Sequence, residues 1–83
     1  MSINIKVLGT GCPKCKALEK AIREVVEENH YDAQIEKVED IVKIMNYGIL
    51  ATPGMVINEK VVSSGRLLSK DEIKTLIEKH ING

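Results

Sequence analysis

The first half of the chain changes its hydrophobic periodicity twice, and those changes constrain the fold more than any other feature. Over residues 3–8 apolar and polar side chains alternate, as in a half-buried β-strand. Residues 13–28 carry an apolar stripe with the 3.6-residue period of a helix, and residues 33–38 again favour a strand. A strand–helix–strand unit of this length implies a right-handed crossover between two parallel strands.

The second half predicts a short helix over 40–46, two strands over 55–57 and 60–63, and a last helix. Glu59 takes the second position of the tight turn between the strands, where glycine is the usual residue. The last helix opens with the capping sequence Ser69-Lys70-Asp71-Glu72. From the short helix we expect three apolar side chains to face inward: Ile41, Ile44 and Met45.

The predicted order is therefore β-α-β-α-β-β-α, an α/β fold in which one mixed four-stranded sheet is packed with helices. Because the sequence has neither a linker nor an internal repeat, we expect residues 1–83 to form a single domain.

Composition narrows the classes of function. Hydrophobic residues make up 43% of the 83 residues and charged residues 29%, which excludes an intrinsically disordered chain. Lys plus Arg and Asp plus Glu both number 12, so the formal net charge is zero, and we expect no nucleic-acid partner. The sequence also has no targeting segment and no apolar run long enough to span a bilayer, so we expect a cytoplasmic protein without membrane insertion.

Two cysteines lie where the first strand gives way to the first helix, in the segment Gly11-Cys12-Pro13-Lys14-Cys15. Proline is favoured at the first helical position, which predicts Cys12 at the N-cap. Unpaired backbone N–H groups and the helix dipole stabilise a thiolate there, so Cys12 should be the nucleophile. Cys15 continues the buried stripe of the helix, so its sulfur should face inward and resolve the mixed disulfide that Cys12 forms.

Other uses of the cysteine pair are less well supported. A closed zinc site needs four ligands, yet the chain has only two cysteines, and His30 lies about 25 Å along the helix from Cys12. A structural disulfide across so short a loop adds little stability. Copper(I) accepts two thiolates, so a soft-metal carrier is the alternative function. Against it, Thr10 stands where small copper carriers commonly have methionine, and the chain ends in a helix where theirs end in a strand.

A second motif, Thr52-Pro53, precedes the predicted hairpin. Together with the cysteine pair it makes the chain resemble the thioredoxin-like superfamily, and most closely the small redox-active disulfide proteins of bacteria and archaea. The matching segments cover most of the chain in the right order: residues 9–15, 47–49, 52–54, 56–58 and 61–62, with Gly65. The resemblance implies a thioredoxin-like fold, a cis-proline at Pro53 beside the cysteines, and a backbone at Thr52 that pairs with an extended segment of the partner protein.

The chain also departs from its best-known relatives. Gly11 stands where thioredoxins have tryptophan, and the sequence shows no equivalent of the acid buried beneath their cysteine pair. Ser63-Ser64-Gly65-Arg66 lacks the acid with which glutaredoxins hold glutathione, which favours protein partners over glutathione.

We therefore predict a monomeric thiol–disulfide oxidoreductase without cofactor or metal. Cys12 and Cys15 are its catalytic residues, Thr52 and Pro53 bind the substrate, and protein disulfides or dithiols and a reductase are its partners.

Overall fold

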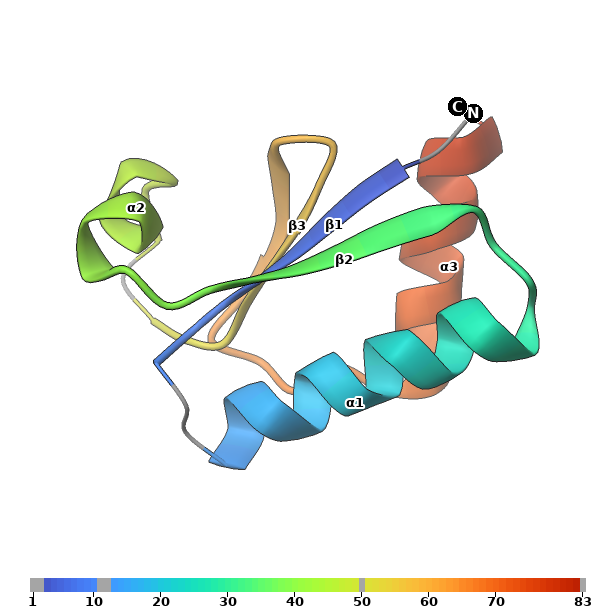
Figure 1. The fold of residues 1–83 in the computed structure, drawn as a ribbon, viewed down its shortest axis with the longest axis horizontal. Coiled ribbons are helices and arrows are strands. Elements are labelled where there is room, and N and C mark those ends of the chain that lie inside the picture. The colour runs from blue at the N-terminus through green and yellow to red at the C-terminus, as the bar shows by residue number, and fades with distance from the viewer. Residues whose placement is uncertain (1–2, 11–12, 50, 83) are drawn as a thin grey trace.

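The computed structural model describes residues 3–10, 13–49 and 51–82 of the chain (Figure 1). Within these ranges the elements follow one another in the predicted order, and their bounds lie within one residue of those expected from the sequence. They are β1 (Ile3–Leu8), α1 (Pro13–Glu28), β2 (Ala33–Val38), α2 (Ile41–Asn46), β3 (Gly54–Ile57), β4 (Lys60–Ser64) and α3 (Lys70–Asn82).

The strands form one four-stranded sheet in the order β2-β1-β3-β4. β1 runs parallel to β2, in a register that pairs Ile3 with Ala33 and Leu8 with Val38. β3 is antiparallel to both β1 and β4, and a register shift interrupts its pairing with β4. The parallel strand–helix–strand unit and the mixed sheet are therefore both confirmed.

The two faces of the sheet are covered unequally. α1 and α3 lie side by side on one face, and α2 lies apart from them at one end of the sheet (Figure 1). The larger core fills the space beneath α1 and α3 and includes Ile5, Met55 and Ile73. The smaller core, on the other face, consists of Leu8, Val38, Ile44, Ile49 and Val56. The side chains of β1 therefore contribute to both cores, one on each face of the sheet.

The prediction for α2 was correct for Ile44 and wrong for its neighbours. Ile44 is buried, whereas Ile41 is 61% exposed and Met45 is 66% exposed. The smaller core is formed mainly by other elements: of its five buried residues, α2 contributes Ile44, and β1, β2, β3 and the segment after α2 contribute the rest.

Both helix starts outside α1 are capped as their sequences suggest. The Asp40 carboxylate accepts a hydrogen bond from the Val42 N–H at the start of α2. At α3 the Ser69 hydroxyl accepts from the Glu72 N–H, and the Glu72 carboxylate accepts from the Ser69 N–H, which forms the expected capping box. Among the described residues, no helix combines the length and the apolar character that crossing a membrane would require.

Candidate functional site

The two sequence motifs converge at one end of the sheet. β1 and β2 are parallel, so both end there, and the Gly9 N–H donates a hydrogen bond to the Val38 carbonyl at 3.0 Å. β3 starts at the same end, since Gly54 pairs with Leu8. The start of α1, which follows β1, and the Thr52-Pro53 segment that precedes β3 are therefore brought to the same end of the sheet by the topology (Figure 1).

Cys15 lies in the first turn of α1 and is 1% exposed. It belongs to the buried stripe expected from the sequence, which continues through Leu18, Ile22 and Val25. Its sulfur is disulfide-bonded in this structure. Cys12 and its expected place at the N-cap lie outside the described residues.

Gly9 brings the two motifs into contact. It is buried at the end of β1, where a Cβ atom added to it would overlap the Cys15 Sγ and would lie 3.8 Å from the Thr52 Cβ. Cys15 and Thr52 therefore both lie on the side of Gly9 where a side chain would project. Sequence reasoning treated Gly9 only as the residue that ends the first strand, and nothing in the local pattern singled it out from Gly11.

The Thr52–Pro53 peptide bond is cis, as the resemblance implies. Pro53 is fully buried, while Thr52 is exposed. The carbonyl of Pro53 accepts a hydrogen bond from the Gly65 N–H at 2.8 Å, which fixes this segment to the chain that follows β4. Gly65 has a φ of 72°, a left-handed conformation that favours glycine. The hairpin thus holds Pro53 in place and leaves Thr52 accessible.

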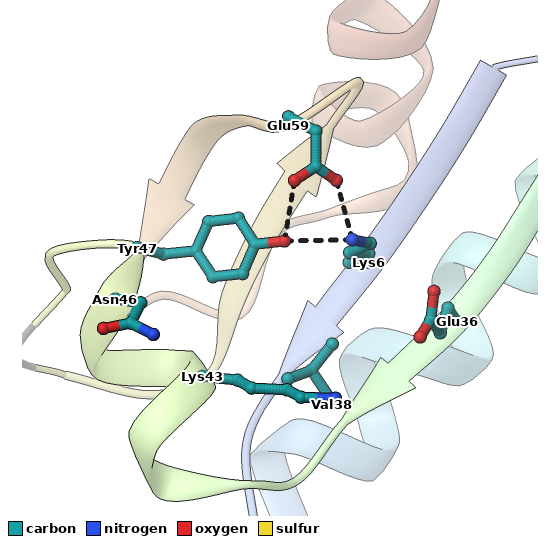
Figure 2. Close-up of a pocket in the computed structure, with 7 residues that line it drawn as sticks. All are labelled: Lys6, Glu36, Val38, Lys43, Asn46, Tyr47 and Glu59. Carbon is teal, nitrogen blue, oxygen red and sulfur yellow. Dashed lines mark hydrogen bonds and ion pairs between the residues drawn. The ribbon is translucent and has the colours of Figure 1, made fainter.

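A polar cluster lies away from Cys15 and lines a pocket beside α2 (Figure 2). The Lys6 ammonium forms an ion pair with Glu59 at 2.7 Å and donates a hydrogen bond to the Tyr47 hydroxyl at 3.0 Å. Tyr47 in turn donates to Glu59 at 3.1 Å. Hydrogen bonds from Lys6 and then Tyr47 lower the pKa of Glu59, and the Glu59 carboxylate, followed by Tyr47, raises the pKa of Lys6.

Sequence reasoning missed this cluster, because its members come from β1, the end of α2 and the β3–β4 turn. Lys6 projects from the face that carries the smaller core, and Cys15 packs from α1 on the other face. The cluster is therefore not part of the cysteine site.

The described residues include no group of three or more His, Cys, Asp and Glu side chains placed to hold a metal ion. His80 is near the end of α3, where its Nδ1 lies 2.9 Å from the Leu76 carbonyl, and His30 is exposed just after α1.

Comparison with known proteins supplies the family. Residues 3–78 match the family model described as a thioredoxin domain. The chain belongs to the thioredoxin family. Among curated relatives, a thioredoxin of Methanothermobacter thermautotrophicus is 39% identical over 90% of this chain and 97% of its own length. A thioredoxin of Methanocaldococcus jannaschii is 35% identical over 95% of this chain and 91% of its own length.

Solved structures agree at the level of the fold. Thioredoxin-2, a component of malaria parasite protein secretion machinery, superposes with a TM-score of 0.75 over 95% of this chain and 84% of its own, at 13% identity. The germline-specific thioredoxin Deadhead of Drosophila melanogaster gives a TM-score of 0.67 over 94% of this chain and 80% of its own, at 15% identity. The predicted thioredoxin-like fold is confirmed.

Proposed function

We propose that this chain exchanges electrons with protein disulfides through Cys12 and Cys15. Membership of the thioredoxin family makes it a thiol–disulfide oxidoreductase, and its archaeal relatives carry the name thioredoxin. The observation that carries the finer proposal is the buried sulfur of Cys15. It contacts Gly9, which also approaches Thr52 of the exposed segment before Pro53.

The exchange takes place in two steps. In the first, the Cys12 thiolate attacks one sulfur of the partner's disulfide, forms a mixed disulfide and displaces the other partner sulfur as a thiolate. In the second, Cys15 loses its proton to solvent and its thiolate attacks the Cys12 sulfur. The intermolecular S–S bond breaks, a Cys12–Cys15 disulfide forms, and the second partner sulfur leaves as a thiolate. Two electrons pass to the partner, and a reductase must return two to the cysteine pair.

The surroundings of the pair suit a protein partner. Cys15 is buried, which protects it from partner disulfides until Cys12 has reacted. Cys12 therefore makes the first attack, and Cys15 resolves the mixed disulfide. Thr52 is exposed just before the start of β3, and its backbone offers a place for an extended partner segment to pair. We also propose that the protein acts as a cytoplasmic monomer and is reduced by a separate protein.

Cysteine substitutions test this function. The reduced wild-type protein should reduce insulin, and Cys12→Ser and Cys15→Ser should each abolish turnover. Cys15→Ser should still attack, so it should retain a partner as a mixed disulfide, which non-reducing electrophoresis detects. Turnover by Cys12→Ser would contradict the mechanism. Trapping by Cys12→Ser but not by Cys15→Ser would show that the roles are reversed.

A further inference from the structure

We infer that Gly9 is a positioning residue for Cys15, whose sulfur occupies the space that a side chain at position 9 would fill. The inference rests on the proposed function, because it concerns how readily the cysteine pair passes between its dithiol and disulfide forms. Added bulk at position 9 should destabilise the disulfide form more than the dithiol form.

The contact is tight and has little room to relax. A Cβ on Gly9 would overlap the Cys15 Sγ and would lie 3.0 Å from the Cys15 Cβ. Cys15 is 1% exposed and packs from α1, which is held by the larger core through Leu18 and Ile22. The hydrogen bond to the Val38 carbonyl holds the Gly9 backbone at the end of the sheet. Neither the backbone of α1 nor that of Gly9 can therefore withdraw without disturbing the core or the sheet.

Glycine is needed at position 9 for space and not for backbone freedom. The glycines with a positive φ are Gly48 and Gly65 among the described residues, and Gly9 is not one of them. An alanine could thus adopt the same backbone conformation, so the effect of Gly9→Ala reports the contact with Cys15.

The two redox forms should respond differently to that contact. In the dithiol form the Cys15 sulfur can rotate about χ1 away from an added methyl group, while the 3.0 Å contact with the Cys15 Cβ is common to both forms. In the disulfide form its bond to the other cysteine holds the sulfur in place, so the overlap must be relieved by displacing backbone or core. The added methyl group therefore shifts the equilibrium toward the dithiol form. It also slows the second step of exchange, because that step forms the disulfide.

The neighbouring strand offers a matched control. Gly54 begins β3 at the same end of the sheet, and a Cβ added there would lie 2.7 Å from the Ile49 Cδ1 and 3.4 Å from the Leu8 Cδ1. None of the three nearest atoms to that position belongs to Cys15. Gly54→Ala should therefore disturb packing equally in both redox forms.

The experiment equilibrates wild type, Gly9→Ala and Gly54→Ala with mixtures of reduced and oxidised dithiothreitol. We expect Gly9→Ala to lower the equilibrium constant for oxidation about tenfold, which corresponds to a reduction potential about 30 mV higher. Gly54→Ala should leave that constant unchanged. Thermal unfolding gives a second readout: Gly9→Ala should lower Tm more in the oxidised protein than in the reduced one, and least in a Cys15→Ala background.

The outcomes separate the inference from the proposed function. Equal oxidation constants for wild type and Gly9→Ala, or an equal loss of Tm with and without the Cys15 sulfur, would overturn the role of Gly9. If Gly9→Ala alone does not fold, Gly9→Ala with Cys15→Ala should fold, and failure of that double variant would also overturn it. If the wild-type protein does not reduce insulin but Gly9→Ala still lowers the equilibrium constant for oxidation, the proposed function is refuted and the positioning role of Gly9 is kept.

Discussion

Glu59 adopts a backbone conformation that favours glycine, with a φ of 68°, and Asn58 before it has a φ of 50°. Its carboxylate explains why a larger residue stands there, since it binds the Lys6 ammonium and accepts a hydrogen bond from Tyr47. Tyr47 caps the end of α2, and Lys6 lies in the middle of β1. One exposed carboxylate therefore ties the hairpin turn, the central strand and the short helix together (Figure 2).

Removing the charge of Glu59 should weaken this link. We expect Glu59→Gln to lower Tm by about 2–4 °C at neutral pH, as for other partly exposed ion pairs. Because the pKa of Glu59 is lowered in the folded state, its contribution is present above the carboxyl's unfolded pKa of about 4.3. The contribution disappears as the pH falls through the lowered value. Thermal unfolding across this range should therefore show the Tm values of the two proteins converging in acid.

Two control variants separate the carboxylate from the backbone. Glu59→Gly loses both interactions but suits the positive φ, and Glu59→Ala loses both and does not suit it. Glu59→Ala should be less stable than Glu59→Gly. Equal Tm values for wild type and Glu59→Gln at neutral pH would show that the charge of Glu59 contributes nothing to stability.

At the scale of elements, α2 is held by one buried side chain and by its end caps. Ile44 packs into the smaller core, while Ile41, Val42 and Met45 are more than 60% exposed. Periodicity could not show this, because fewer than two helical turns place apolar residues on several sides, and the width of the core beneath is set by other elements.

Substitutions in α2 should therefore differ sharply in how far they lower the free energy of unfolding. Ile44→Ala should lower the free energy of unfolding by about 2–4 kcal/mol, because it leaves a cavity between α2 and the sheet. Met45→Ala, the matched control, should change it by less than about 0.5 kcal/mol, since Met45 is 66% exposed. Urea unfolding measures both, and a large loss for Met45→Ala would contradict the exposed position of that side chain.

The two long helices are joined by a polar contact as well as by the core. The Tyr31 hydroxyl, just after α1, donates a hydrogen bond to Glu78 of α3 at 2.7 Å. Burial, and then the interaction with Glu78, raise the pKa of Tyr31 to about 12. A raised tyrosine pKa stabilises the fold at pH values below the unfolded value of about 10, and this contribution is lost as the pH rises toward 12.

Titration can isolate this phenol, because the chain has two tyrosines and no tryptophan. In Tyr47→Phe, the ultraviolet absorbance of phenolate should rise near pH 12. With Glu78→Gln as well, the midpoint should fall, since the carboxylate that favours the protonated phenol is lost. A midpoint near 10 with Glu78 intact would contradict the hydrogen bond.

For the molecule as a whole, the sequence was informative wherever neighbouring residues carry the signal. The strand alternation, the stripe of α1 and the capping box at Ser69 predicted the elements, and the parallel unit followed from their lengths. The sequence was uninformative wherever the fold joins distant residues. The Lys6–Tyr47–Glu59 cluster and the contact of Gly9 with Cys15 depend on the sheet register and helix packing, which no local pattern encodes.

The alternative function, in which the cysteine pair carries copper(I), can be judged from the surroundings that the whole fold gives to the pair. The described residues bring together no cluster of three or more His, Cys, Asp and Glu side chains that could hold the ion. Cys15 is also 1% exposed and its sulfur lies against Gly9, which limits the access of a metal ion to it. We therefore expect the reduced protein to bind copper(I) no more tightly than dithiothreitol does, in a competition titration. Cys15→Ser should weaken this binding further, and an affinity far above that of dithiothreitol would favour the carrier.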